Sequence, residues 1–370
     1  MLESAKRPLF WFGHGIRLAG AVDLIEPFLE KFNVPFITSW QGKDMVDHNH
    51  LRFFGHAGIY GHRAANKIVQ KADLIIAIGT RLALPQTGYD LSKFAPNAQL
   101  IKIDLDDAET EKLGRGITIQ KDAGVWMREF METEPPCFPV AWIVECDSIQ
   151  DELLGIDYLA REDKNGYINS YNFCAELNKW LKPDQIIVTD MGTALLTAYP
   201  MLKLNGKQRL ITSTGLGEMG FGLPGAIGAS IGNGNSEVLC LNCDGGMMMN
   251  LQELATIKHH KLPIKIIVFD NKGYNMIRRS QEGMGMAHSG SDEKDLSFPE
   301  WGFLARAFDI KFCWVQTWDE FNKNIPMVMK SKEAWLVQVL IDPNQKFGPK
   351  VPTLKDENGK IYSPELSEMV

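Results

Sequence analysis

Short apolar runs alternate along the chain with longer segments in which apolar residues recur every three or four positions. In the first third, the runs RPLFWFG, VPFIT, DLIIAIG and QLIKIDLD predict buried strands at residues 7–13, 34–38, 73–79 and 99–106. The amphipathic segments between them predict helices at about 19–32 and 63–72. Strands of this kind that alternate with helices are typical of a parallel sheet covered on both faces.

The same alternation returns in the second half after a proline-rich break. The segment ETEPPCFPV interrupts the pattern, and the polar stretch LAREDKNGYINS, at 159–170, is interpreted as the end of a linker. Strands are then predicted at 185–190, 237–244 and 264–271, with helices at 172–181 and 251–260. We therefore predict two doubly wound α/β domains, each a mostly parallel sheet flanked by helices. The predicted parts are a first domain at 1–133, a linker at 134–168, a second domain at 169–343, and an extension at 344–370 that lies over the second domain.

Composition narrows the class of protein. The net charge of −7 argues against a surface for nucleic acid or acidic membrane lipid, because such partners select basic patches. No apolar run reaches the roughly 20 residues that span a bilayer, and the N-terminus lacks the apolar core of a signal peptide. Six cysteines without a regular framework indicate a reducing compartment, so we expect a cytoplasmic protein. Cys240 and Cys243 form a C-x-x-C pair that we predict to be reduced and packed, because no second pair completes a zinc site.

One acidic residue lies at the carboxyl end of a predicted strand. The predicted strands at 237–244 and 264–271 are joined by one helix, which is the pattern of a right-handed βαβ unit. The carboxyl ends of these two strands therefore lie at the same edge of the sheet. Asp244 ends the first of them and Asn271 ends the second, 27 positions later. Gly245 and Gly246 allow close backbone approach, and the helix that begins near Asn250 favours a bound anion at its N-terminus. A carboxylate, a carboxamide and phosphate oxygens around one point predict a Mg²⁺ site that holds a diphosphate.

These residues resemble the fingerprint of thiamine diphosphate-dependent enzymes, which is usually written GDG followed one βαβ unit later by NN. The segment STGLGEMGFGLPGAIGAS, at 213–230, is similar to the part of acetolactate synthases that precedes the metal motif. In the first half, KRPLFWFGHGIRLAGA, ADLIIAIGTRL and LIKIDLDDAE resemble the middle domain of the same enzymes. Over nearly its whole length, the chain thus resembles the Rossmann-like middle domain and the diphosphate-binding C-terminal domain of acetolactate-synthase-like enzymes.

The resemblance implies a cofactor site in the second domain. Asp244 and the side chain of Asn271 would bind Mg²⁺, with the backbone carbonyl of Gly273 as a third ligand. Met219 would be a wedge that bends thiamine diphosphate, and the carbonyl of Gly217 would accept a hydrogen bond from its aminopyrimidine ring. The other cofactor-binding residues that the resemblance implies are Gly192, Thr193, Gly245, Gly246 and Met276. With this cofactor such enzymes decarboxylate or join 2-oxo acids, as lyases or transferases, and we expect a homo-oligomer.

Four positions, in three segments, depart from the pattern of ordinary acetolactate synthases. Cys243 replaces the first glycine of GDG, and Thr193 with Ala194 replaces a glutamine–histidine pair in the diphosphate-binding segment. Ser280 stands where those synthases carry a tryptophan that shapes the acceptor pocket. Branched-chain acetolactate synthesis is therefore not the reaction that we expect, and the donor and acceptor substrates stay open.

Nothing in the chain resembles the pyrimidine-binding domain that precedes the middle domain in these enzymes. That domain carries the glutamate that activates the cofactor, so no catalytic residue is assigned within this chain. We expect a separate pyrimidine-binding chain to supply it, as in one half of a two-chain 2-oxo acid decarboxylase. The alternative is a truncated, catalytically inactive relic or a binding module that keeps the fold.

Two other cofactors are weighed against thiamine diphosphate. The turn GHGIRLAG, at 13–20, is too loose a glycine pattern to predict a dinucleotide, and no acidic residue beyond it completes a nicotinamide site. Some enzymes of the family bind FAD at the middle domain, but GTRLALPQTGYD, at 79–90, lacks the residues expected for that role. We therefore expect no FAD.

Overall fold

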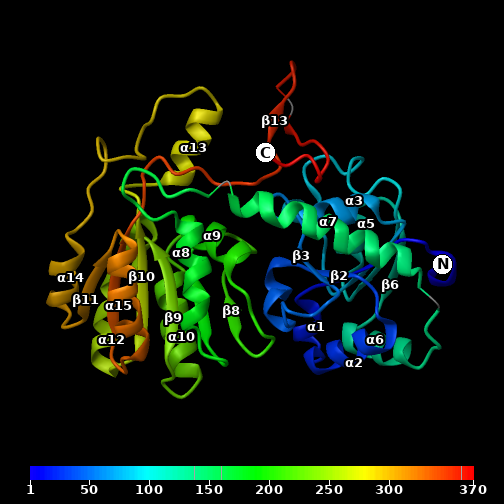
Figure 1. The fold of residues 1–370 in the computed structure, drawn as a ribbon, viewed down its shortest axis with the longest axis horizontal. Helices are drawn as coiled ribbons and strands as arrows, with labels where there is room; N and C mark the ends of the chain where they lie inside the picture. The colour runs from blue at the N-terminus through cyan, green and yellow to red at the C-terminus, as the bar shows by residue number, and fades with distance from the viewer. Residues whose placement is uncertain (137, 160, 360) are drawn as a thin grey trace. The chain divides into compact units, whose positions relative to one another are not determined.

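The computed structural model describes residues 1–136, 138–159, 161–359 and 361–370. The chain divides into two compact units, each built around one six-stranded sheet (Figure 1). The first unit comprises Met1–Ala160, Leu204–Gly206 and Gly348–Val370. The second unit comprises Arg161–Lys203 and Lys207–Phe347.

The sheet of the first unit is parallel throughout, in the order β3-β2-β1-β4-β5-β6. Its strands are β1 (Pro8–Phe12), β2 (Phe36–Thr38), β3 (Phe53–His56), β4 (Leu74–Ile78), β5 (Gln99–Asp104) and β6 (Ile117–Gln120). Every residue of β1 and β4 is buried, as expected for apolar strands that lie between two helical layers. The strand order reverses between β1 and β4, which is where open sheets of this kind bind ligands.

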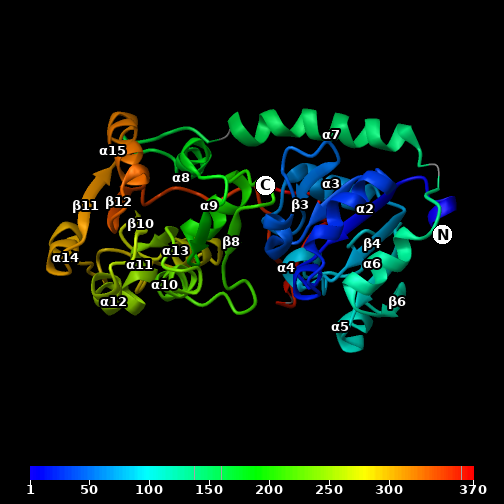
Figure 2. The ribbon, with the colours of Figure 1, turned by 90° about the horizontal axis from the view of Figure 1, so that it is seen from below.

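Helices cover both faces of the first sheet. On one face, α2 and α6 bury Phe28 and Trp126 in an aromatic cluster. On the other face, α3 and α7 share a core that contains Ile68 and Trp142, and Figure 2 shows α7 running beside α3. The helices of this unit are α1 (Gly15–Leu18), α2 (Ile25–Phe32), α3 (Arg63–Lys71), α4 (Leu84–Thr87), α5 (Asp107–Glu111), α6 (Ala123–Met131) and α7 (Val140–Leu159).

The predicted linker differs from what the structure shows. It contains α7, a helix of 20 residues that starts directly after Pro139. Proline is well tolerated at the beginning of a helix, so the proline-rich break marks a helix start here. Because Cys146 and Ile149 of α7 are buried in the core of the first unit, the helix is part of that unit.

The place predicted for the C-terminal extension is wrong. Residues 348–370 belong to the first unit, whereas the prediction assigns the extension to the second domain. Val351 and Leu366 are buried in the first unit's core, and the N–H of Val351 donates to the carbonyl of Ile59 at 2.8 Å. The extension also forms a small antiparallel ribbon of β13 (Leu354–Lys355) and β14 (Ile361–Tyr362). A few apolar side chains in a polar segment are enough to fix it on a core.

The second unit has the same layered plan with a different strand order. Its parallel sheet runs β11-β12-β10-β9-β7-β8. The strands are β7 (Ile186–Thr189), β8 (Arg209–Ile211), β9 (Val238–Cys243), β10 (Ile264–Asp270), β11 (Lys311–Val315) and β12 (Trp335–Leu340). The order reverses between β7 and β9, so this is the predicted ligand-binding crevice of the second sheet.

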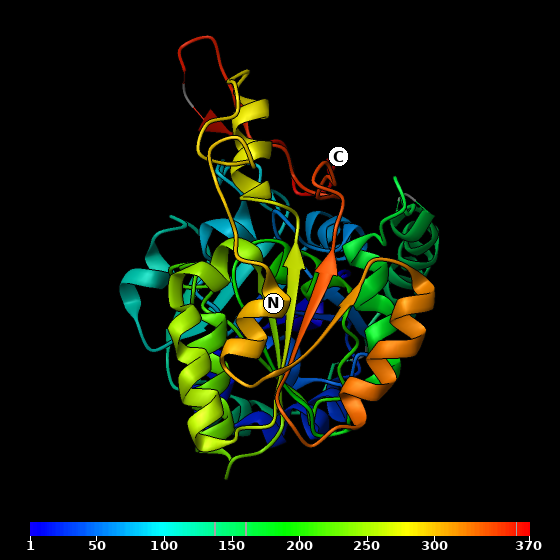
Figure 3. The same ribbon diagram turned by 90° about the vertical axis from the view of Figure 1, so that its left-hand side faces the viewer.

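Helices again cover both faces of the second sheet, with α15 (orange) on one side and α12 (yellow-green) on the other (Figure 3). The helices are α8 (Ser170–Leu177), α9 (Thr193–Met201), α10 (Gly222–Gly232), α11 (Asp244–Asn250), α12 (Leu254–His260), α13 (Asn275–Gly283), α14 (Trp301–Ala307) and α15 (Trp318–Lys330). The prediction of two doubly wound α/β domains is thus confirmed. Within the described ranges, no helix combines the length and the apolar character needed to cross a bilayer.

Candidate functional site

Three acidic residues lie at the carboxyl ends of neighbouring strands in the second sheet. Asp190 follows β7, Asp244 follows β9, and Asp270 is the last residue of β10. All three side chains are buried. Because β7, β9 and β10 are parallel neighbours, their ends share one edge of the sheet, as the sequence predicted for Asp244 and Asn271.

The Asp244 carboxylate is enclosed by backbone N–H groups. Its Oδ1 accepts from Gly245 at 2.7 Å, and its Oδ2 accepts from Asn271 at 3.1 Å and from Gly273 at 3.0 Å. Burial and the nearby charge of Asp270 raise the pKa of Asp244 to about 7, although the N–H donors act in the opposite direction. The N–H groups thus hold the carboxylate in place without compensating its charge.

Asn271 and Gly273 form a turn around that carboxylate. The Asn271 side chain is buried, and its Nδ2 donates to Thr193 Oγ1 at 3.1 Å. Gly273 has φ +141, and a Cβ at this position would lie 2.3 Å from the carbonyl oxygen of Ser291. Only glycine fits there. The structure therefore brings together the three residues predicted as metal ligands, Asp244, Asn271 and Gly273, with Thr193 beside them.

The predicted helix after the acidic residue begins earlier than expected. The sequence predicts a start near Asn250, but α11 begins at Asp244 itself. A short 3₁₀ turn, Leu251–Glu253, separates it from α12. The N-terminus of α9 also lies beyond its strand end, with Gly192 at φ +94 as its N-cap. N–H groups at a helix start lack an acceptor within the helix and therefore favour anions. Here Gly245 N donates to Asp244 Oδ1, and Ala194 N donates to Cys243 Sγ.

The two glycines after Asp244 make room for side chains of this chain. A Cβ on Gly245 would lie 2.2 Å from the ring of Tyr274, and one on Gly246 would lie 1.8 Å from Asp190 Oδ2. The sequence assigned these glycines to close approach of a diphosphate. The structure shows a further reason for them, because Asp190 and Tyr274 occupy the space that a side chain would need.

Met219 lies in the loop between β8 and α10, near the same strand ends. It is 39% exposed, and its Cε would lie 3.3 Å from a Cβ on Gly245. Gly217, two residues earlier, has φ +68. Met276 is half-buried on α13, and the contact described for it is its carbonyl, which accepts from Ser280 Oγ at 3.0 Å. Met219 is therefore placed near the other site residues, whereas no hydrogen bond among the described residues links Met276 to them.

Sequence reasoning missed Asp190. Its two oxygens accept the N–H of Gly220 at 3.0 and 3.1 Å, so it holds the loop that carries Met219. Burial raises its pKa, and backbone N–H groups around it, those of Met191 and Gly220 among them, act in the opposite direction. Its position at the end of strand 185–190, equivalent to that of Asp244, was a signal that could have identified it.

Sequence reasoning also missed Arg278, which is buried on α13 and donates to the carbonyl of Asn271 at 2.9 Å. Cys243, which replaces a family glycine, contacts the segment before α9. Its Sγ accepts from Ala194 N at 3.3 Å and donates to the Met191 carbonyl at 3.4 Å. Burial raises the pKa of the Cys243 thiol, which fits the predicted packed and reduced state.

The donor set fits a hard cation better than a softer one. Within the described ranges, no three His, Cys, Asp or Glu side chains gather as a metal site. The set at the strand ends is one carboxylate, one carboxamide and the backbone of Gly273, which are the oxygen groups that Mg²⁺ prefers. The burial of the Asp244 carboxylate among the site residues supports the fit, because a cation would stabilise the charged form that burial disfavours.

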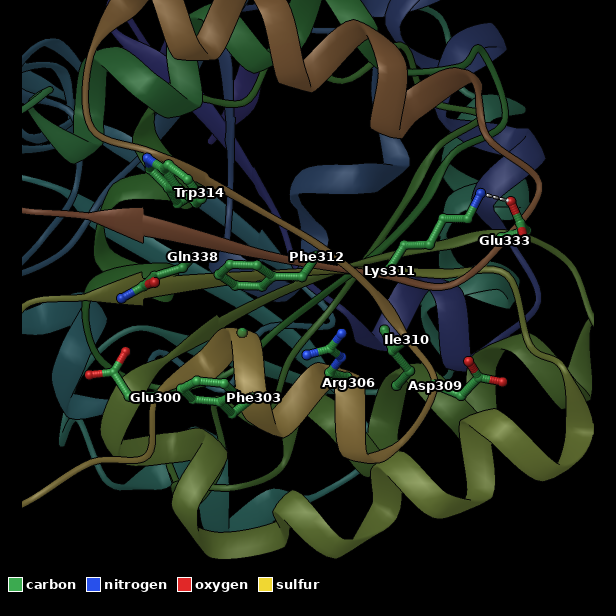
Figure 4. Close-up of a pocket in the computed structure, with 11 residues that line it drawn as sticks. Glu300, Phe303, Arg306, Asp309, Ile310, Lys311, Phe312, Trp314, Glu333 and Gln338 are labelled. Carbon is green, nitrogen blue, oxygen red and sulfur yellow. Dashed lines mark ion pairs between the residues drawn. The ribbon is translucent and has the colours of Figure 1, made fainter.

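A separate cavity of about 680 Å³ lies between α14 and the edge strand β11 (Figure 4). Phe303, Phe312 and Trp314 line it with Arg306, and none of the predicted cofactor or metal residues is among its lining residues. Gln338 from its wall donates to Asp270 Oδ2 at 2.6 Å. The cavity is therefore connected through Gln338 to Asp270 at a strand end, and it is separate from the predicted cofactor and metal residues.

Comparison with known proteins gives two matching family descriptions. Residues 1–130 match "Thiamine pyrophosphate enzyme, central domain", and residues 190–339 match "Thiamine pyrophosphate enzyme, C-terminal TPP binding domain". Thiamine pyrophosphate is the same compound as thiamine diphosphate. The second match begins at Asp190 and includes every residue predicted for the cofactor and the metal.

Similar proteins are large subunits of acetolactate synthases. The chain is 32% identical over 354 residues to acetolactate synthase isozyme 2 large subunit of Escherichia coli (strain K12), covering 95% of this chain and 63% of the relative. It is 30% identical over 375 residues to the probable acetolactate synthase large subunit of Methanococcus aeolicus, covering 97% of this chain and 62% of the relative. The chain spans less than two thirds of the length of these relatives. It belongs to the thiamine pyrophosphate enzymes, and has their central domain and their C-terminal cofactor-binding domain.

Proposed function

We propose that the second unit binds thiamine diphosphate through a Mg²⁺ ion held by Asp244, Asn271 and the carbonyl of Gly273. The observation that carries this proposal is the enclosed carboxylate of Asp244, a buried acid whose pKa is raised to about 7. Burying a carboxylate without a counter-charge is unfavourable. A divalent cation held by these residues would remove that disadvantage, and it would supply the positive charge that a diphosphate requires.

The chain's own residues would hold the two ends of the cofactor. Backbone N–H groups at the start of α9, after Gly192, would face the diphosphate. Met219, exposed in part on a loop held by Asp190, would pack against the ring system. When bound, thiamine diphosphate supplies an electron sink for cleavage of the bond beside the carbonyl of a 2-oxo acid. We propose 2-oxo acids as substrates, in a lyase or transferase reaction.

The loops and helices that carry the site also expose large apolar side chains. Leu216 in the Met219 loop is 91% exposed, and Met249 on α11 is 48% exposed. Ile277 and Met284, on α13 and at its end, are exposed too. Such apolar side chains around a site favour a covering partner. We propose that a pyrimidine-binding domain of another chain covers this surface, and that the assembly is an oligomer.

Exchange of the cofactor's C2 proton tests the partner requirement. We expect the isolated chain with Mg²⁺ to exchange this proton no faster than free thiamine diphosphate, because a cofactor-activating acid is not among its predicted site residues. Addition of a pyrimidine-binding domain in trans should accelerate exchange, as followed by NMR. Rapid exchange without the partner would contradict partner dependence. Cofactor binding without acceleration by any such domain would favour the alternative of a binding module.

A further inference from the structure

The carboxamide of Asn271 is held from both ends. Thr193 is the first residue of α9 and is buried, and its Oγ1 accepts from Asn271 Nδ2 at 3.1 Å. On the other side, Nη2 of Arg278 lies 3.3 Å from Asn271 Oδ1, the longest of three contacts to oxygen that share the two hydrogens of this nitrogen. An arginine can only donate, so the oxygen end of the carboxamide must face Arg278. A flipped carboxamide would place two donors against each other on the Arg278 side and would lose that bond, whereas the Thr193 hydroxyl can accept or donate and would keep a bond in either orientation.

Arg278 also fixes the backbone of the same turn. Its guanidinium donates to the carbonyls of Asn271 at 2.9 Å, Ser291 at 2.8 Å and Pro343 at 3.1 Å. Five N–H donors in a rigid fork suit this task, whereas a lysine has a single mobile head group. The side chain is buried, which lowers its pKa, while the charge of Asp244 acts in the opposite direction. Arg278 therefore joins three backbone segments beside the acidic ligand.

Oδ1 of Asn271 keeps one lone pair for a cation. A carboxamide oxygen has two lone pairs, and Arg278 occupies one of them. We propose that Thr193 and Arg278 are positioning residues for Asn271, and this rests on the proposed function. Arg278 fixes which end of the carboxamide is the oxygen, and Thr193 anchors the opposite end, so that Oδ1 is held toward the metal. Groups that orient a metal ligand commonly contribute 10- to 100-fold in metal affinity, by order of magnitude. The side chain of Thr193 thus has a role apart from the diphosphate contact that the resemblance implies.

The hydroxyl of Thr193 is tested by matched substitutions. Thr193→Val keeps the shape of the side chain and removes the hydroxyl, whereas Thr193→Ser keeps the hydroxyl. Mg²⁺ is titrated calorimetrically into the full chain at saturating thiamine diphosphate. We expect Thr193→Val to weaken Mg²⁺ affinity by roughly 10-fold or more and Thr193→Ser to restore it to within about threefold. Equal Mg²⁺ affinity in wild type and Thr193→Val would overturn the role of Thr193.

Thr197→Val is the matched control on the same helix. Thr197 is also buried, but its hydroxyl is not bonded to Asn271. It donates to the Thr193 carbonyl at 2.8 Å and lies 3.5 Å from Cys174 Sγ. Thr197→Val should lower the melting temperature of the apoprotein and leave Mg²⁺ affinity within about threefold of wild type. A loss of affinity equal to that of Thr193→Val would show that α9 responds as a whole, which contradicts a specific role for Thr193.

Arg278→Lys tests the other side of the carboxamide, with Arg279→Lys as its control. Arg279 follows on the same helix and pairs with Glu282 at 2.8 Å. We expect Arg278→Lys to speed hydrogen exchange of the apoprotein's 271–273 amides, and to weaken Mg²⁺ affinity by roughly 10-fold or more. Arg279→Lys should do neither. Unchanged exchange and affinity in Arg278→Lys would overturn the role of Arg278.

Failure of the inference differs from failure of the proposed function. If wild type binds thiamine diphosphate equally with Mg²⁺ and with EDTA, the proposed function fails, and the positioning roles fail with it. If wild type needs Mg²⁺ and the Thr193 and Arg278 variants match it, the metal site stands and only the positioning roles are wrong.

Discussion

The two units contain the same kind of sheet, yet only one of them places acidic side chains at its switch point. In the first unit, Gly13 follows β1 and Gly79 follows β4, on the two sides of the reversal in strand order. The Gly15 N–H donates to the Gly79 carbonyl at 2.8 Å, and a Cβ on Gly13 would lie 2.2 Å from that oxygen. Backbone fills the crevice there. In the second unit, Asp190 and Asp244 follow the equivalent strands β7 and β9.

This difference separates what the fold decides from what the residues decide. The topology fixes where strand ends meet in both units. The residue after each strand then determines whether the two segments at the switch point pack closely through their backbones or present charged side chains. Burial shifts the pKa of a titratable group in each unit, and the direction differs: it lowers the pKa of His56 in the first unit and raises that of Asp244 in the second. These two groups should therefore change stability with pH in opposite directions.

The largest expected effect is that of Gly246→Ala. A Cβ there would lie 1.8 Å from Asp190 Oδ2 and 2.7 Å from Asn242 Oδ1, both on buried side chains that cannot move away easily. We expect the second unit to lose about 3 kcal/mol of stability, together with most of its cofactor affinity. Hydrogen exchange in peptides of each unit measures the stability change. The control is Gly228→Ala in α10, where a Cβ has open space and should stabilise by about 0.5 kcal/mol.

Two methionines distinguish the core from the site in the second unit. Met247 is fully buried, so Met247→Ala should cost about 3 kcal/mol of stability. Met219 is partly exposed, so Met219→Ala should cost less than about 1 kcal/mol. If Met219 packs against the cofactor, its replacement should weaken thiamine diphosphate binding roughly 10-fold, or about 1.4 kcal/mol. Denaturation of the apoprotein and calorimetric titration give the two values. The reverse pattern would assign Met219 to the core.

The smallest expected effect is the acid sensitivity of the first unit. Burial, followed by the charges of His62, Lys43 and His48, holds the pKa of His56 well below 6.5. The unfolded chain therefore binds a proton that the folded unit does not, so stability is present above about pH 6.5 and decreases as the pH falls below it. We expect about 1 kcal/mol lost per pH unit at first, and His56→Leu should reduce this slope. Hydrogen exchange of β3 peptides at pH 5 to 7 measures it, and a slope unchanged by the substitution would rule out His56 as its source.

The sequence predicts seven of the twelve strands in the two sheets, together with the strand-end acid Asp244, because these depend on local patterns; β3, β6, β8, β11 and β12 are not predicted. Apolar runs identify buried strands, and a carboxylate directly after such a run, as at Asp244, has few structural reasons to be there. The βαβ connection then brings Asn271 to the same edge without any knowledge of distant contacts. The α/β class and the family resemblance also depend on local patterns of residues, and both are confirmed.

What the sequence could not predict depends on contacts between distant segments. Arg278, within MIRRSQE, reads as a solvent-facing helix residue, and its burial depends on loops near Ser291 and Pro343. The helix α7 follows three prolines, which indicate a break in the fold as readily as a helix start. The C-terminal extension has only scattered apolar residues, so its choice of core is a matter of tertiary packing.

The central claim is that the strand ends of the second unit hold a cation that binds the diphosphate. Mn²⁺ can replace Mg²⁺ at an oxygen site and gives an anomalous signal in X-ray diffraction. Crystals of the full chain with Mn²⁺ and thiamine diphosphate should show one anomalous peak at about 2.1 Å from an Asp244 oxygen, Asn271 Oδ1 and the Gly273 carbonyl, on the side of the diphosphate. Ordered cofactor with no peak at these residues, or a peak at other residues, would contradict the account.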